Sequence, residues 1–277
     1  MFFEVAGRRI GSLAVNLIRL GPALVLLALW GWIVRGYPLP TDASAEAWFY
    51  LAISGWVGFV IGDVCLFRAF LLMGTRLSTL VMALWPALAA IMSWFVFGEA
   101  LGGWDVLGMT LTIGGIAMAV GDRASSDTTG AQRNVRRGLV LALIGALGQA
   151  GGLVLSKVGM GDYDAFAATQ IRIMAAIVGF VVLFTAIGWW GKIAVAVKNG
   201  PAVAYTSLGA VFGPFIGVSL SLYAVKHTSM GVGASIMATT PIIIIPMVVL
   251  VHRARVGVMS VLGAVIAVGG VAVLFLI

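Results

Sequence analysis

The sequence has few charged residues and almost no cysteine. Only 10% of its 277 residues are charged, well below the roughly 25% found in soluble domains. The single cysteine, Cys65, excludes an internal disulfide and a metal site built from several cysteines. No stretch matches a Gly-rich phosphate-binding loop, an HExxH metal motif or a nucleophile elbow. We therefore expect no catalytic residues, no cofactor and no bound metal.

The chain is instead rich in apolar residues. Hydrophobic residues make up 61% of it and the mean hydropathy is +1.11, which indicates an all-α integral membrane protein. Because about 20 apolar residues span a bilayer as a helix, the apolar runs predict nine spans. They cover residues 13–34, 48–73, 77–97, 103–121, 138–159, 165–189, 202–225, 229–251 and 257–277.

The two halves of the chain repeat one another. Five features of the first half recur 155 residues later: Gly58 as Gly213, Gly62 as Gly217, Trp85-Pro86 as Thr240-Pro241, Gly108 as Gly263, and Gly114-Gly115 as Gly269-Gly270. The segment 14–19 also recurs as 167–172, at an offset of 153. Duplication of this kind in a membrane protein is typical of transporters.

The repeat defines the predicted domains. Residues 1–121 form a first repeat of four spans, 122–137 a polar cytoplasmic linker, and 138–277 a second repeat of five spans. The first repeat lacks a counterpart of the second repeat's first helix, so we expect either a start codon placed too late, which we favour, or a naturally shortened protein. An odd number of helices per repeat predicts an inverted repeat of five-helix bundles.

Basic residues in the connections predict the orientation. Of fourteen such residues, eleven fall on one side of the membrane, and only Arg35, Lys157 and Lys226 fall on the other. Since short cytoplasmic loops are enriched in Lys and Arg, the N-terminus and the linker should be cytoplasmic and the C-terminus extracytoplasmic, in a cell (inner) membrane. The net charge of +7 thus reflects membrane topology, and we expect no nucleic-acid partner.

The order of the motifs resembles the EamA domain of the drug/metabolite transporter superfamily. The resemblance is carried by the segment 62–78, by Trp85-Pro86, and by Gly98-Glu99 after an apolar helix, and the second half repeats it with 222–229, Thr240-Pro241 and Gly269-Gly270. It covers nearly the whole chain. The second copy departs from the pattern, because it carries the basic segment 252–255 where Gly98-Glu99 stands in the first.

The resemblance implies a ten-helix carrier of small metabolites, often amino acids. We expect a secondary transporter that works by alternating access, an exporter rather than an importer, with proton or ion coupling as an option. The residues do not indicate the substrate or the oligomeric state.

Charged residues inside apolar runs are costly and mark functional or paired groups. Asp63 lies near the middle of its span and either binds a cationic group or proton, or forms a structural ion pair with Arg19 or Arg172. Arg19 and Arg172 are repeat equivalents. They are either architectural or form a clamp for a carboxylate, which a planar guanidinium suits.

Other polar and aromatic residues complete the predicted site. Asn16 shares a helix face with Arg19, Gln170 is close to Arg172 in sequence, and Gln149 lies mid-span among glycines, where it binds a ligand or another helix. Pro86 and Pro241 should bend equivalent helices, with Trp85 and Thr240 beside the transport cavity.

Three other functions are compatible with the pattern. An exporter of lipophilic cations would use Asp63 as its binding carboxylate, whereas a carrier of zwitterions would need an arginine as well. A membrane-embedded enzyme or a scaffold is less consistent with two repeats that bury charge.

Overall fold

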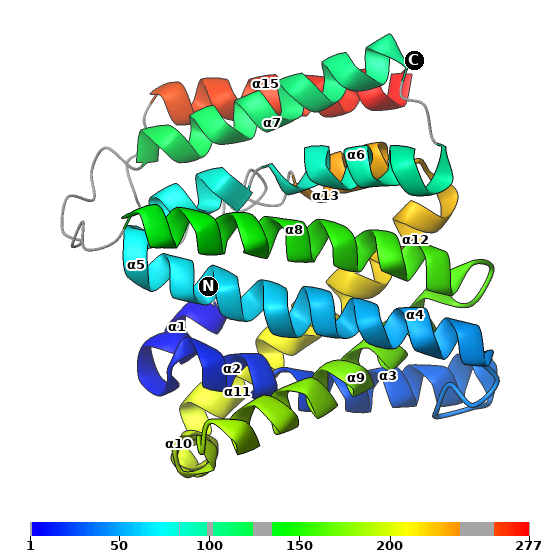
Figure 1. The fold of residues 1–277 in the computed structure, drawn as a ribbon, viewed down its shortest axis with the longest axis vertical. Coiled ribbons are helices and arrows are strands. Elements are labelled where there is room, and N and C mark those ends of the chain that lie inside the picture. Colours follow the sequence, from blue (N-terminus) through cyan, green and yellow to red (C-terminus); the bar gives the residue numbers. More distant parts are fainter. Residues whose placement is uncertain (1, 83, 99–101, 124–134, 239–257, 277) are drawn as a thin grey trace. The chain divides into compact units, whose positions relative to one another are not determined.

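The protein is built from helices. The computed structural model describes residues 2–276 except 83, 99–101, 124–134 and 239–257, and this part of the chain contains no strand (Figure 1). Five of its helical segments are long and apolar enough to cross a membrane: Ser12–Arg35, Ala45–Phe70, Val135–Met160, Ala165–Ala186 and Gly200–His227. The all-α membrane fold expected from composition is confirmed.

The described helices are distributed over both halves of the chain. In the first half they are α1 (Phe2–Ile10), α2 (Ser12–Ile18), α3 (Leu20–Arg35), α4 (Ala45–Gly55), the π-helix η1 (Trp56–Gly62), α5 (Asp63–Met82), α6 (Trp85–Phe97) and α7 (Gly103–Arg123). In the second half they are α8 (Val135–Met160), α9 (Ala165–Ala186), α10 (Trp190–Lys198), α11 (Gly200–Ala210), the π-helix η3 (Val211–Val218), α12 (Ser219–His227), α13 (Met230–Ala238) and α15 (Val258–Leu276).

Two predicted boundaries are wrong. The chain does not turn between 73 and 77, because α5 continues to Met82 and includes Arg76; a lone glycine such as Gly74 costs a helix only about 1 kcal/mol and does not end it. Pro86 lies in the first turn of α6 rather than inside a longer helix. The missing N–H of proline is tolerated there, so Pro86 begins a helix instead of bending one.

Two short helices escaped the search for 20-residue runs. They are α1 and α10, each of nine residues. The predicted span 165–189 accordingly ends early, at Ala186, and α10 follows after a turn at Gly188, whose φ of 66° suits glycine.

The described helices group into two compact units that do not coincide with the two sequence repeats. Unit 1 contains residues 1–67 and 151–227, and unit 2 contains residues 68–150 and 228–277. Each unit therefore combines helices from both halves of the chain. In a duplicated protein this arrangement means that helices of one repeat pack on helices of the other.

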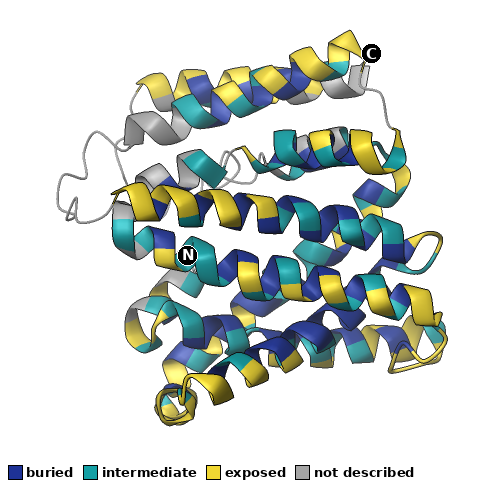
Figure 2. Ribbon diagram, in the orientation of Figure 1, coloured by how far each residue is buried: buried dark blue, intermediate teal, exposed yellow. Residues whose placement is uncertain are grey.

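Glycines allow close helix contacts in unit 1. A Cβ atom on Gly55 would clash with the Arg172 carbonyl oxygen, and one on Gly159 would lie 2.6 Å from the Tyr50 Cβ. These contacts bring α4 against α9 and α8, as small residues do in membranes. The indole N–H of Trp56 donates to the Ala175 carbonyl at 2.8 Å. As a result α9 is buried over much of its length, whereas α10 is mostly exposed (Figure 2).

In unit 2, α7 and α15 lie side by side (Figure 1). A Cβ on Gly115 would lie 2.5 Å from the Ala267 amide nitrogen, and one on Gly270 would lie 2.5 Å from the Thr112 hydroxyl. The glycines Gly115 and Gly270 belong to the Gly-Gly pairs that the repeat analysis matched. They serve here to bring equivalent helices of the two repeats into contact.

Candidate substrate-binding site

Arg19 lies at an interruption between α2 and α3. The residues Ser12–Arg35 form one candidate membrane span. Within it, α2 ends at Ile18 and α3 begins at Leu20. Pro22 explains the interruption. Its ring clashes with the backbone carbonyl four residues earlier, and its nitrogen carries no hydrogen to donate to that carbonyl. That carbonyl belongs to Ile18, directly before Arg19.

Asp63 follows a π-helix, and the second repeat has a π-helix at the same place. η1 covers Trp56–Gly62 and η3 covers Val211–Val218, and an offset of 155 superimposes their first residues. π-helical turns in membrane and soluble proteins are frequent at functional sites. Pro214 inside η3 removes a backbone donor, and both segments belong to unit 1.

Asp63 and Arg19 form an ion pair within unit 1. The Arg19 guanidinium donates through Nη2 to Asp63 Oδ2, and the side chains are 15% and 10% exposed. Of the alternatives left open by the sequence, the structure therefore shows the pair with Arg19. The pair links the break between α2 and α3 to the end of η1.

Arg172 brings a second guanidinium to the same place. It is 6% exposed on α9, and its charge interacts with the Asp63 carboxylate. Its Cζ atom lies 5.0 Å from the Phe59 ring centroid, and the Arg19 Cζ lies 6.0 Å from the same centroid. Phe59, an η1 residue that the sequence analysis missed, thus has both arginines within cation–π distance.

The cluster Arg19, Asp63, Arg172 and Phe59 carries one positive charge in excess. The other acidic side chains that the structure describes in unit 1 lie in connections or in the first turn of α4: Asp42, Glu46, Asp162 and Asp164. A net charge buried among apolar helices is costly unless a counter-ion compensates it. The cluster is therefore suited to a group with negative charge.

Several buried polar atoms of unit 1 have no hydrogen-bond partner within the described chain. Besides Arg35 Nη1 at the end of the unit, they are both side-chain amide atoms of Asn16, the Nε atoms of Arg19 and Arg172, and the Ser219 hydroxyl oxygen. Asn16 lies one turn before Arg19, and Ser219 directly follows η3. Buried polar atoms normally have partners, so these atoms indicate places where a polar ligand could bind.

Gln170 has a different task. It is buried, and its amide nitrogen donates to the Pro38 carbonyl at 2.8 Å. This bond fixes the 36–44 connection to α9. The structure therefore favours a role for Gln170 in holding this loop over a role in substrate binding.

The remaining predicted site residues belong to unit 2 or lie outside the described residues. Gln149 is half-buried on α8, and Trp85 packs with Ile116 and Ala267 in unit 2. Thr240 and Pro241 lie outside the described residues, so the place of Thr240 beside the cavity and the bend at Pro241 stay predictions.

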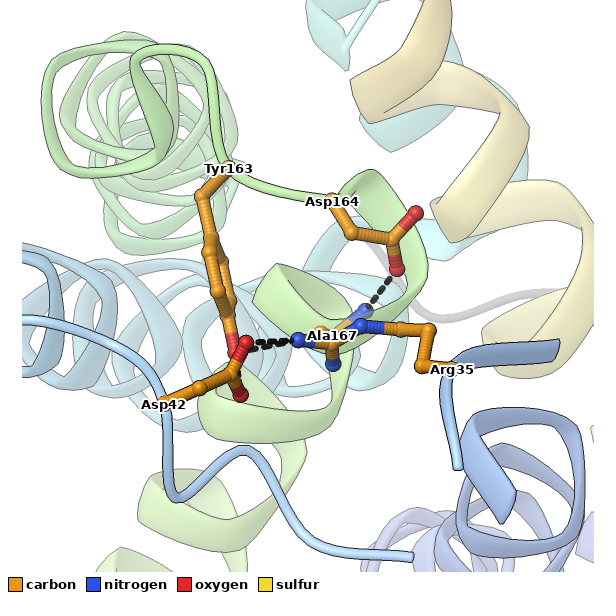
Figure 3. Close-up of polar contacts among 5 residues, drawn as sticks. All are labelled: Arg35, Asp42, Tyr163, Asp164 and Ala167. Carbon is orange, nitrogen blue, oxygen red and sulfur yellow. Dashed lines mark hydrogen bonds and ion pairs between the residues drawn. The ribbon is translucent and has the colours of Figure 1, made fainter. Parts of the chain in front are cut away.

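A polar cluster at one end of unit 1 was not predicted. Tyr163 accepts a hydrogen bond from Arg35 Nη2 at 3.0 Å and donates to Asp42 Oδ1 at 2.8 Å, and Arg35 also forms an ion pair with Asp42 (Figure 3). Lys226 donates to the Asp162 and Tyr163 carbonyls at 2.7 and 3.3 Å. Next to it, the Asp164 carboxylate caps α9 by accepting from the Ala167 amide (Figure 3).

The pKa values of Tyr163 and Asp42 define which groups of this cluster are charged at neutral pH. Burial raises the pKa of Tyr163, and together with the Asp42 contact it outweighs the lowering effect of Arg35, giving a value of about 12. Burial alone would raise the pKa of Asp42, but hydrogen bonds from Tyr163 and Arg35 hold it below its ordinary value. Asp42 is thus ionised and Tyr163 neutral, which the observed hydrogen bonds require.

The grouping of basic residues agrees with the charge pattern. Arg35 and Lys226, assigned to one side of the membrane, meet at this end of unit 1. The 36–44 connection follows α3 and leads into α4, and Gln170 near the start of α9 binds it. The start of α2 and the end of α9 therefore lie at the opposite end of unit 1. Arg9 and Lys192 are found there, as the pattern requires.

The comparisons with known proteins decide the family. The profile of the EamA-like transporter family matches residues 1–121 and again residues 136–276. The chain belongs to the EamA-like transporter family. The resemblance inferred from the repeated motifs is confirmed, and so is the expectation of a multi-pass membrane protein.

Two relatives add to this assignment. An uncharacterized transporter of Synechocystis sp. is 29% identical over 109 residues, which are 38% of this chain and 31% of the relative. The match therefore spans about a third of that relative's length. A crystal structure with 17% sequence identity covers 99% of this chain and 90% of its own, with a TM-score of 0.70, and this likeness concerns the fold alone.

Proposed function

We propose that this EamA protein is a secondary carrier that moves small metabolites bearing a carboxylate, such as amino acids, out of the cell by alternating access. The observation that carries the proposal is the cluster in unit 1, where two guanidiniums surround one carboxylate. A substrate carboxylate would neutralise the excess positive charge. It could also accept two parallel hydrogen bonds from a guanidinium, whose planar donor geometry matches a carboxylate.

The alternative of a lipophilic cation is less well supported. Asp63 would have to be available to the cation, yet its carboxylate is paired with Arg19 and interacts with Arg172. A cation entering this place would meet two like charges. An amino acid presents both charges, so its ammonium group could exchange for one arginine at Asp63 while its carboxylate meets the other.

The interrupted helices support alternating access. Both η1 and the break at Arg19 replace regular backbone hydrogen bonding next to the charge cluster, and η3 repeats the π-helical turn in the other half. Non-regular backbone inside membranes is typical of binding sites in transporters. We propose that the repeats rock about this place.

Reconstituted protein tests the proposal. We expect proteoliposomes loaded with unlabelled amino acids or short organic acids to accumulate the labelled compound by counterflow. Lipophilic cations should show no accumulation above that of empty liposomes. Accumulation of cations alone would overturn the proposal in favour of the alternative.

We also propose that the end of unit 1 with Arg9 and Lys192 faces the cytoplasm, as the excess of basic residues on that side indicates. A reporter fused after Ile277 should then be active only outside the cytoplasm, and one inserted in the 122–137 linker only inside. The reverse pattern would show that the charge bias assigns the wrong side.

A further inference from the structure

The helix α10 lies across the direction of the spans. Figure 1 shows α10 nearly end-on, whereas α4 and α9 run across the view. It contacts α2 and α11 at the end of unit 1 where α9 ends. A short helix with this orientation is suited to the plane of a membrane–water interface.

A pocket of about 350 Å³ lies between α10 and the end of α1. Its lining consists of Arg9, Ile10, Gly191, Lys192, Val195, Ala196 and Asn199. Two of these residues are basic and none is acidic. Because all of them belong to unit 1, the pocket is defined within one compact part of the chain.

The two cationic side chains are held by aromatic rings. The Lys192 ammonium lies 4.4 Å from the Trp189 ring centroid, and the Arg9 Cζ lies 6.0 Å from that of Tyr205. Within the part of the chain whose side chains are described, neither forms an ion pair with a carboxylate. Both positive charges are therefore available to an anion in the pocket.

The helix that borders this basic pocket also exposes apolar residues. Val195 lines it and is 71% exposed, and Val197 and Trp190 are exposed on the same helix. Exposed valine and tryptophan at an interface are suited to lipid chains and to the headgroup region, respectively. A free anion would make no use of them.

We propose that this pocket binds the phosphate headgroup of an anionic phospholipid, with the acyl chains against the apolar side of α10. Basic pockets between helices at the membrane surface suit such headgroups, and each basic residue there strengthens binding. The bound lipid connects α1 to α10. Both helices rest on α2 and α11, so the lipid stabilises the end of the span that carries Arg19.

Native mass spectrometry of the full-length protein in detergent tests the site. Titration with phosphatidylglycerol should give one tightly bound lipid, and phosphatidylcholine should not compete for it. The double variant Arg9→Gln/Lys192→Gln should weaken phosphatidylglycerol binding about 30-fold. Lys198→Gln is the matched control, since Lys198 is basic and exposed on α10 but does not line the pocket.

Two further arms decide what is bound. Val195→Glu places a carboxylate at an exposed position of the pocket, so it should abolish lipid binding without affecting the fold, even if the double variant were unstable. Inorganic phosphate at millimolar concentration should not displace the lipid. Displacement by phosphate, equal weakening by Lys198→Gln, or unchanged binding by Val195→Glu would each overturn the proposal.

Discussion

Replacing Arg172 by glutamine should lower the transport rate strongly without loss of stability. The guanidinium is almost completely buried, and its Nε has no hydrogen-bond partner within the described chain. Removing its charge loses the attraction to Asp63 but relieves a larger desolvation cost, and Asp63 keeps its ion pair with Arg19. A charge-assisted hydrogen bond to substrate is worth about 1.5–3 kcal/mol. Since 1.4 kcal/mol equals a factor of ten, transport should fall by about 10- to 100-fold.

The measurement pairs two quantities on the same purified variant. Counterflow in proteoliposomes gives the transport rate, and thermal unfolding in detergent gives the stability, which should be equal to or above that of the parent protein.

Arg172→Lys should recover part of the transport, because it restores the charge but not the two-pronged geometry. Arg68→Gln is the control, as Arg68 is exposed. Full transport by Arg172→Gln would remove Arg172 from the substrate site.

Replacing Asp63 by asparagine should have the opposite effect on stability. The substitution keeps the size of the side chain but leaves Arg19 and Arg172 without the carboxylate that compensates them. Breaking a buried ion pair by removing one partner costs about 3–5 kcal/mol. We expect a clear fall in melting temperature together with the loss of transport.

A double variant separates structure from function. Asp63→Asn combined with Arg19→Gln removes both members of the ion pair, so the stranded charge of Arg19 disappears and much of the stability should return. Transport should stay low, because the substrate's ammonium group would lack its carboxylate. If the double variant transported at the parent rate, the Arg19–Asp63 pair would be purely structural.

The sequence predicted the spans well, because a helix that crosses the bilayer must be apolar over about 20 residues. The spans at 138–159 and 103–121 match α8 and α7 closely. It failed where a local signal was ambiguous. The predicted break between the spans 48–73 and 77–97 is absent, because α5 runs through residues 74–76. Pro22 and Pro214, which accompany the interruptions in unit 1, carried a signal that could have been used, since proline inside an apolar run predicts a break.

The candidate site was only half predictable. Arg19, Asp63 and Arg172 stood out because charge inside an apolar run is expensive. Phe59 did not, because an aromatic residue in such a run is ordinary. The cluster of Arg35, Asp42 and Tyr163 was also missed. Asp42 and Arg35 precede Tyr163 by 121 and 128 residues in the sequence, and none of the three residues is unusual by itself.

The sequence by itself determined that this is a duplicated, all-helical membrane protein of the EamA-like family, since hydropathy, repeat spacing and motif order are properties of the chain. Only the tertiary structure decided that Asp63 pairs with Arg19, that Arg172 joins them, and that each compact unit draws on both repeats. A repeat offset shows which residues are equivalent but not which are neighbours. Neighbours are set by helix packing, where glycines such as Gly55 let one backbone approach another.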